Sequence, residues 1–355
     1  MQHLIPLTLL ASLAFAAAPA AAQTGAATAT YRVTFDATWS AATHPTAFPP
    51  TAHFSPLIGA TLAPGAHLWQ AGALATDGIE FMAETGGTTP LTSEVNALIT
   101  AGTADQVVAG PAAGSPDLVS TTFTVTDAHP TVSLVTMIAP SPDWFVGVDA
   151  VALFENGQWK DSLTIPLFAY DSGTDSGQQF FAVNQDTNPP AAIHMITDGP
   201  LGGTPALGTF TFERLHSSVE YGTCDNPAGS LALTTPPTLG QIASFQVHDP
   251  IGLVTPAATL MAFSLGQAPG PCGTLLPGWG LSAIDAPGAL LIGDALQYKA
   301  GPTWTGTPVS VDVPIPALPS LVGLDVFAQG VLIGDHPAGG PRFGATSGLH
   351  LTLGS

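Results

Sequence analysis

The stretch VSLVTMIAPSPDWFVGVDAVALFENGQWKDSLTIPLFAYDSGTDSG, residues 132–177, decides the fold. Its first part, Val132–Ile138, is apolar and rich in β-branched residues, which predicts a buried strand that ends at the Pro-rich turn PSPD. A second apolar run, WFVGVDAVALF, leads into Asn156-Gly157. These two residue types suit a two-residue type I′ turn, because both of its central positions have positive φ. The sequence therefore predicts a β-hairpin whose return strand covers residues 158–170.

This hairpin also predicts a group of carboxylates at its open end. Opposed positions across the turn sum to 313, as 156 and 157 do, so Asp143 is expected opposite Tyr170, one residue before Asp171. Directly opposed residues lie about 5 Å apart. The Gly-containing loop that follows can bring Asp175 back to the same place. Because three carboxylates repel one another and the chain has only 5 Lys and Arg residues, a bound cation is expected among them.

The chemistry of these ligands favours calcium. Oxygen-only ligands suit a hard ion, and a small flexible loop suits Ca²⁺, which takes six to eight oxygens in irregular geometry, better than Mg²⁺. The prediction is a Ca²⁺ site formed by Asp143, Asp171 and Asp175, completed by backbone carbonyls and water. The alternative is that these aspartates are turn and capping residues on a solvated rim, as Asp near Gly and Ser usually is.

Several segments resemble a known family. PSPDWFVGVDAV and YDSGTDSG look like the most characteristic segments of the spondin N-terminal domain, and YRVTFDATWSAATHPTAFPPTAHFSPLIGATL, residues 31–62, is similar to the opening of that domain. The resemblance covers roughly residues 30–215. It implies a β-sandwich resembling calcium- and phospholipid-binding domains, with calcium held by aspartates of the two segments quoted first. In this sequence those positions are Asp143, Asp171 and Asp175.

The ends and the charge of the chain indicate an exported protein. Residues 1–22 form an apolar run that closes with AAA before Gln23, which predicts a signal peptide and a mature protein that is secreted and extracellular, either free or held at a cell surface. No other segment reaches the 18 or more apolar residues that a membrane-spanning helix needs. The formal net charge of −20 disfavours binding to nucleic acid.

A second domain is expected from residue 222 to residue 355. Short alternating runs separated by Pro and Gly turns predict a small all-β sandwich or jelly roll. Cys224 and Cys272 are the only cysteines of the chain, and in an exported protein such a pair predicts one disulfide. A reactive or metal-binding thiol pair is the alternative, although the pair lacks the C-x-x-C spacing.

Two further pairs of polar residues are candidates for other roles. His44 and His53 lie in a Pro-rich loop and are more often loop-bonding residues than metal ligands. Residues 68–98 hold the expected helical content. Glu80 and Glu84 there would share one helix face, and a solvated surface is the favoured interpretation.

The functional prediction is a secreted calcium-binding adhesion or recognition protein whose ligand is an unknown extracellular or cell-surface protein or glycan. No catalytic motif such as H-E-x-x-H or G-x-S-x-G occurs, so no catalytic residue is predicted and the protein is not expected to be an enzyme. Two alternatives remain open. One is a structural module of the cell envelope or matrix, with purely stabilising calcium, and the other is a hydrolase that uses calcium as a Lewis acid.

Overall fold

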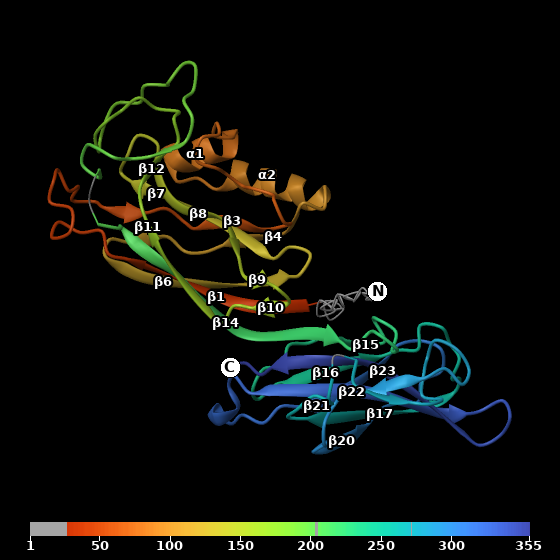
Figure 1. The fold of residues 1–355 in the computed structure, drawn as a ribbon. Helices are drawn as coiled ribbons and strands as arrows, with labels where there is room; N and C mark the ends of the chain where they lie inside the picture. Colours follow the sequence, from red (N-terminus) through yellow and green to blue (C-terminus); the bar gives the residue numbers. More distant parts are fainter. Residues whose placement is uncertain (1–26, 203–204, 271) are drawn as a thin grey trace, which may run out of the picture.

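The computed structural model describes residues 27–202, 205–270 and 272–355, and the predicted signal peptide lies outside them. These residues form two units built almost entirely from antiparallel strands (Figure 1). The prediction of an all-β fold is confirmed.

One sheet of the first sandwich has the strand order β6-β1-β14-β11. Its strands are β1 (Ala27–Ala37), β6 (Asp117–Thr126), β11 (Ser162–Leu167) and β14 (Gly208–Tyr221). Strand β1 forms because its apolar side chains alternate: Tyr31, Val33 and Phe35 are buried, and the residues between them are more exposed. These buried side chains form the face of the strand that packs into the core.

The opposite sheet carries the first part of the fold-deciding stretch. Its strands are β2 (His53–Phe54), β3 (Ile58–Leu62), β4 (Ala104–Ala109), β5 (Ala113–Gly114), β7 (Thr131–Ala139), β8 (Trp144–Ala152), β12 (Tyr170–Asp171) and β13 (His194–Met195). All nine residues of β7 are buried. Leu134 faces the core between the sheets, and Val135 faces the helices on the other side. Both faces of β7 are therefore covered, which explains its continuous apolar sequence.

Two helices, α1 (Asp77–Thr85) and α2 (Thr89–Thr100), cover the outer face of this second sheet (Figure 1). Ile79, Met82 and Val95 point inward and pack against the sheet, so the predicted helical content is confirmed. In the part of the chain that the structure describes, no helix is long and apolar enough to cross a membrane.

The turn of the predicted hairpin is present, but the predicted pairing of its two long strands is wrong. Strands β9 (Phe154–Glu155) and β10 (Gln158–Trp159) pair across Asn156-Gly157, whose φ angles are 54° and 75°. Strand β11 then leaves β8 and pairs with β14 in the opposite sheet. Its Leu163 and Ile165 lie opposite Phe212 and Phe210 of β14, so the apolar residues of the return run complete the other layer of the core.

The second unit is also a sandwich, as predicted. Its elements are β15 (Leu231–Leu233), β16 (Ile242–Val247), β17 (Ala257–Ser264), β18 (Thr274–Leu276), β19 (Gly288–Leu290), β20 (Gln297–Ala300), β21 (Val309–Pro314), the 3₁₀ turn η1 (Pro319–Leu321), β22 (Asp325–Asp335) and β23 (Pro341–Thr352). A three-stranded sheet of β15, β16 and β21 lies across the core from β17, β22 and β23. Phe245, Met261, Trp304 and Leu332 fill the space between them.

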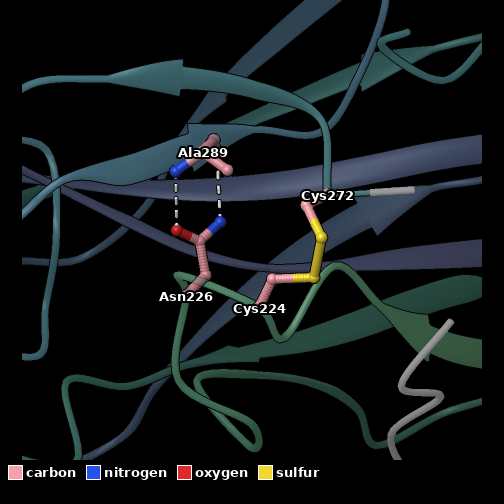
Figure 2. The surroundings of a disulfide bond; sticks show 4 residues. All are labelled: Cys224, Asn226, Cys272 and Ala289. Atoms are coloured by element: carbon pink, nitrogen blue, oxygen red, sulfur yellow. Dashed lines mark hydrogen bonds between the residues drawn. A yellow bond between two sulfur atoms is a disulfide. The ribbon is translucent and has the colours of Figure 1, made fainter. Parts of the chain in front are cut away.

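The predicted disulfide between Cys224 and Cys272 is present, with an S–S distance of 2.04 Å (Figure 2). Beside it, the buried Asn226 side chain receives a hydrogen bond from the Ala289 N–H and donates one to the Ala289 carbonyl, both at 2.8 Å. The amide pair holds the segment after β14 against β19, and the disulfide links the same segment to Cys272, just before β18.

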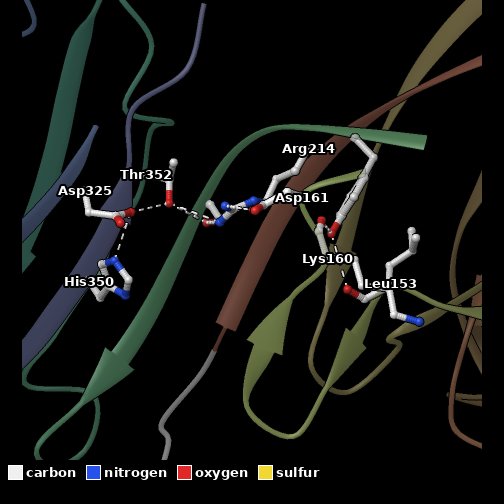
Figure 3. A network of polar contacts seen from close by, with 9 residues as sticks. Leu153, Lys160, Asp161, Arg214, Asp325, His350 and Thr352 are labelled. Atoms are coloured by element: carbon white, nitrogen blue, oxygen red, sulfur yellow. Dashed lines mark hydrogen bonds and ion pairs between the residues drawn. The ribbon is translucent and has the colours of Figure 1, made fainter. Parts of the chain in front are cut away.

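Strand β14 connects the two units. It pairs with β1 from Gly208 to Val219, with β11 along its first part, and with β23 along its last part, Ser217–Tyr221. Strand β14 ends directly before residue 222, where the second domain was expected to begin, and both units share one sheet. At this junction Arg214 bonds to Asp161, and it also donates to Thr352 (3.0 Å), which in turn donates to Asp325 (2.9 Å; Figure 3).

Candidate functional site

The predicted carboxylates lie at one end of the first sandwich. Asp143 immediately precedes β8, and Asp171 ends β12 and pairs with Trp144. Asp143 is therefore next to Ser172, whose N–H donates to the Asp143 carbonyl at 3.1 Å. The predicted pairing of Asp143 with Tyr170 is wrong by two positions, because β11 leaves the sheet and the chain rejoins β8 in a different register.

Asp143 is completely buried, and its two carboxylate oxygens have different surroundings. Oδ2 accepts hydrogen bonds from the Ser172 hydroxyl (2.9 Å), the Thr174 N–H (2.9 Å) and the Asp175 N–H (3.1 Å). Oδ1 is also buried and has no hydrogen-bond partner. A buried carboxylate oxygen without a partner is costly, so this atom marks a place where a further ligand is expected.

Asp171 and Asp175 organise the loop that wraps around Asp143. The Gly173 N–H donates to Asp171 Oδ1 at 2.8 Å. Asp175 receives the Gly177 N–H at 2.7 Å and the Gln185 N–H at 3.0 Å, one on each oxygen. These are the bonds expected of turn residues. The turn role that was the alternative to metal binding is thus present in the fold, and a carboxylate oxygen with one such bond still has lone pairs for a cation.

A fourth carboxylate, that of Glu84 in α1, interacts electrostatically with Asp143 and Asp175. Burial raises the pKa of Glu84, a hydrogen bond from Thr174 opposes this shift, and Glu80, Asp143 and Asp175 raise the pKa further by repulsion. We call Glu84, Asp143, Asp171 and Asp175 the acidic rim. The sequence interpretation of Glu84 as part of a solvated helix face missed it, because helical periodicity does not show which loop lies over the end of the helix.

Asp171 has a strongly raised pKa. Burial, followed by repulsion from Asp143, raises its pKa to about 6. The bond from the Gly173 N–H and the charge of His194, whose Nδ1 lies 4.0 Å from Asp171 Oδ1, act in the opposite direction. His194 is the basic side chain that pairs with the rim, and its imidazole carries charge only when protonated. The excess of negative charge is therefore poorly balanced by the protein itself.

The acidic rim has the donor atoms that a hard cation requires. All of its side-chain ligands are oxygens, and Asp143 Oδ1 is buried without a partner, which fits calcium. However, residues 27–202, 205–270 and 272–355 contain no group of three or more His, Cys, Asp or Glu side chains already placed to hold a metal ion. The donor chemistry fits, but the side chains would have to move closer together to bind calcium.

The two histidines of the Pro-rich loop have structural partners. His44 is buried, with Nε2 at 3.0 Å from the Pro205 carbonyl and Nδ1 at 2.8 Å from the Thr43 hydroxyl. Burial lowers the pKa of His44, which favours the neutral ring. His53 Nδ1 lies 2.7 Å from the Thr51 carbonyl. The interpretation of both residues as loop-bonding residues is supported.

The fold and the rim together define a class: an antiparallel β-sandwich with helices over one sheet and an acidic loop cluster at one end. Comparison with known protein families identifies a match for the first unit. The family model described as Spondin_N matches residues 29–201. Residues 29–201 therefore form a spondin N-terminal domain, as their sequence motifs predicted.

Individual relatives agree with this assignment. The chain is 33% identical over 204 residues to Spondin-2 of Rattus norvegicus, which covers 52% of this chain and 61% of that protein. It is 35% identical over 171 residues to Spondin-2 of Homo sapiens (46% and 51%) and 31% identical over 170 residues to Spondin-1 of Gallus gallus (46% and 21%). The matches thus span about half of this chain and 21–61% of the relatives.

Proposed function

We propose that this protein is an extracellular recognition or adhesion protein whose spondin N-terminal domain binds calcium at the acidic rim. The observation that carries the calcium proposal is the buried Asp143 Oδ1, which has no hydrogen-bond partner and belongs to a cluster of carboxylates in which repulsion raises the pKa of Glu84 and of Asp171. A hard cation would satisfy this oxygen and offset the repulsion.

Each rim residue has a distinct role in this proposal. Asp143 and Asp171 would supply the principal carboxylate oxygens, and Glu84 would approach from α1. Asp175 would contribute a remaining lone pair while its backbone bonds hold the loop closed. Calcium would add positive charge to that of a protonated His194.

The extracellular location has separate support. The N-terminal segment predicts export, and the Cys224–Cys272 disulfide is typical of proteins that mature in an oxidising compartment. The relatives are spondins, and the proposal assigns this chain the same general kind of role, with a protein or glycan of the cell exterior as its ligand.

Thermal unfolding with added calcium or with a chelator tests the calcium proposal. Extracellular calcium modules bind at about 0.1 to 1 mM, so about 10 mM calcium on a ~0.1 mM site is expected to stabilise the protein by roughly 2.7 kcal/mol. Asp143→Asn and Asp171→Asn are expected to remove this response. Asp105→Asn, which changes an exposed carboxylate of β4, is the matched control and is expected to respond like the parent protein.

Metal analysis of the purified protein completes the test. The calcium proposal is wrong if calcium leaves the unfolding midpoint unchanged and the protein contains no calcium. An equal response in the Asp143→Asn and Asp105→Asn variants would show that calcium binds elsewhere.

A further inference from the structure

The first sandwich is open along one side of β8. On its other side β8 pairs with β7, but on this side only Trp144 and Phe145 pair, with β12. Beyond Phe145 the chain that could have continued the pairing has crossed to the opposite sheet as β11. Among the described residues, the rest of β8 has no strand neighbour here. Instead of a neighbouring strand, the Trp69 indole N–H donates a hydrogen bond to the Val148 carbonyl of β8, at 3.2 Å.

A cleft of about 490 Å³ lies along this open side. Trp69, Phe168 and Tyr170 provide aromatic surface, with Phe168 39% exposed, and Val151 and Ile165 contribute aliphatic walls. The Trp69 and Tyr170 rings pack against each other nearly edge to face, with their centroids 4.9 Å apart. None of the described residues that line the cleft is a lysine or arginine. The cleft therefore combines aromatic and aliphatic side chains with polar groups, and its described lining has no lysine or arginine of its own.

One carboxylate, Asp149 of β8, lines this cleft and is held in place from both sides. The Ser133 hydroxyl donates to Asp149 Oδ1 at 2.9 Å, and His67 Nδ1 lies 2.5 Å from Oδ2. Each oxygen has two lone pairs, so these two bonds leave acceptor capacity on the carboxylate.

A local irregularity of the backbone presents Asp149. The pairing of β7 with β8 shifts register between Val132 and Leu134, opposite the segment that holds Asp149. The next residue, Ala150, has φ of 47°, a conformation that non-glycine residues rarely adopt, and its N–H donates to the Ser133 hydroxyl at 2.9 Å. A β-bulge of this kind re-aims a side chain at the cost of a ladder bond.

We propose that this cleft binds a lysine or arginine side chain from an extended segment of a partner polypeptide. The cation would lie against the rings of Trp69, Phe168 and Tyr170 and donate to Asp149. Arginine suits the site better, because its planar guanidinium can stack on a ring and donate to a carboxylate at the same time. Apolar neighbours in the segment would pack on Val151 and Ile165.

The negative charge of the protein favours a basic partner polypeptide. The chain carries a formal net charge of −20, which attracts basic polypeptides over long range and repels acidic ones. The inference rests on the recognition role proposed above, but it does not require calcium, since Asp149 is not part of the acidic rim.

Isothermal titration with the peptide acetyl-Val-Arg-Val-amide tests the inference on the mature protein. The neutral comparison is the same peptide with citrulline, which keeps the shape of arginine and lacks its charge. The arginine peptide is expected to bind with a Kd of about 1 mM, as suits one anchored side chain, and the citrulline peptide about tenfold more weakly. Asp149→Asn is expected to weaken arginine-peptide binding about tenfold.

Two further variants separate loss of the site from loss of the fold. Phe168→Ala removes an exposed ring without touching the Ser133–Asp149–His67 bonds, and it is expected to weaken binding several-fold. Asp105→Asn is expected to bind like the parent protein. Equal affinity for both peptides, no binding at millimolar peptide, or unchanged binding in both cleft variants would overturn the inference.

The same titration with chelator distinguishes the two proposals. Arginine-peptide binding that persists without calcium is the expected result and is compatible with failure of the calcium proposal. Binding that disappears with chelator while the protein stays folded would show that the peptide site depends on calcium and would contradict the cleft assignment.

Discussion

Folding removes the carboxyl group of Asp171 from water and places it near Asp143, and its pKa rises to about 6. In an unfolded chain an aspartate titrates at about 3.9. The folded protein therefore binds this proton more tightly than the unfolded chain does. Without calcium, ionisation of Asp171 destabilises the fold as the pH rises from about 4 through about 6, and the full effect is present above that range.

Asp171→Asn is accordingly expected to stabilise the calcium-free protein at neutral pH and to flatten the dependence of stability on pH between about 4 and 6. The asparagine oxygen can still accept the Gly173 N–H, so the loop is expected to persist. Urea unfolding in chelator at a series of pH values measures this effect, with Asp105→Asn as the control. A variant that keeps the slope of the parent protein would assign the pH dependence to other groups, such as Glu84.

At the scale of elements, the two helices are joined by a side chain that caps one from the other. The Glu94 carboxylate of α2 accepts the Gly78 N–H and the Thr76 hydroxyl, both at 2.7 Å, at the start of α1. Glu94 thus satisfies a free N–H of the first turn of α1 and places negative charge at its positive end. This contact positions α1, which carries Glu84 toward the acidic rim.

Glu94→Ala is expected to destabilise the protein by about 1–2 kcal/mol, the usual range for loss of a helix cap. Ser93→Ala is the matched control, because the exposed Ser93 hydroxyl bonds only within α2, to the Thr89 carbonyl at 3.1 Å. Urea denaturation compares the two variants. Equal stability of Glu94→Ala and Ser93→Ala would show that the cap is energetically unimportant.

The elements differ in how far their sequence determines them. The buried run of β7 and the Asn156-Gly157 turn follow from local patterns, and both were predicted. The pairing of β11 with the opposite sheet was not predicted, because the alternating residues of β11 fit either layer of a sandwich. Its position depends on the distant Phe210 and Phe212 of β14.

The candidate site shows the same limit. Asp143 and Asp171 were predicted as neighbours because the turn and the strands around it are close in sequence. Glu84 and the cleft at Asp149 were not predicted, since each depends on contacts between residues far apart in the chain, such as Asp149 with His67. Local patterns gave the elements and part of the rim, whereas the contacts between layers required the structure.

At the scale of the whole molecule, the shared sheet predicts that the two units unfold together. The Cys224–Cys272 bond links residues 48 positions apart, and its loss is expected to cost about 4 kcal/mol through the greater freedom of the unfolded chain. Because β14 pairs with both β1 and β23, a Cys224→Ser/Cys272→Ser variant is expected to lose stability in both units. Hydrogen exchange measures this, with β1 amides reporting on the first unit and β17 amides on the second.

Faster exchange in both strands by a similar factor is the expected result, and the parent protein under reducing conditions is expected to behave like the variant. Faster exchange confined to β17 would contradict the coupling and show that the two units open separately.

The continuity of β14 also determines how the molecule would carry mechanical tension. If one unit were attached to a surface and the other were pulled, the pull would enter β14 at Tyr221 and act along the axis of the strand. Its ladders to β1 and β11 would then be sheared, so that many hydrogen bonds would have to break together rather than one after another. The tension would thus pass into the centre of the first sandwich without depending on a flexible linker.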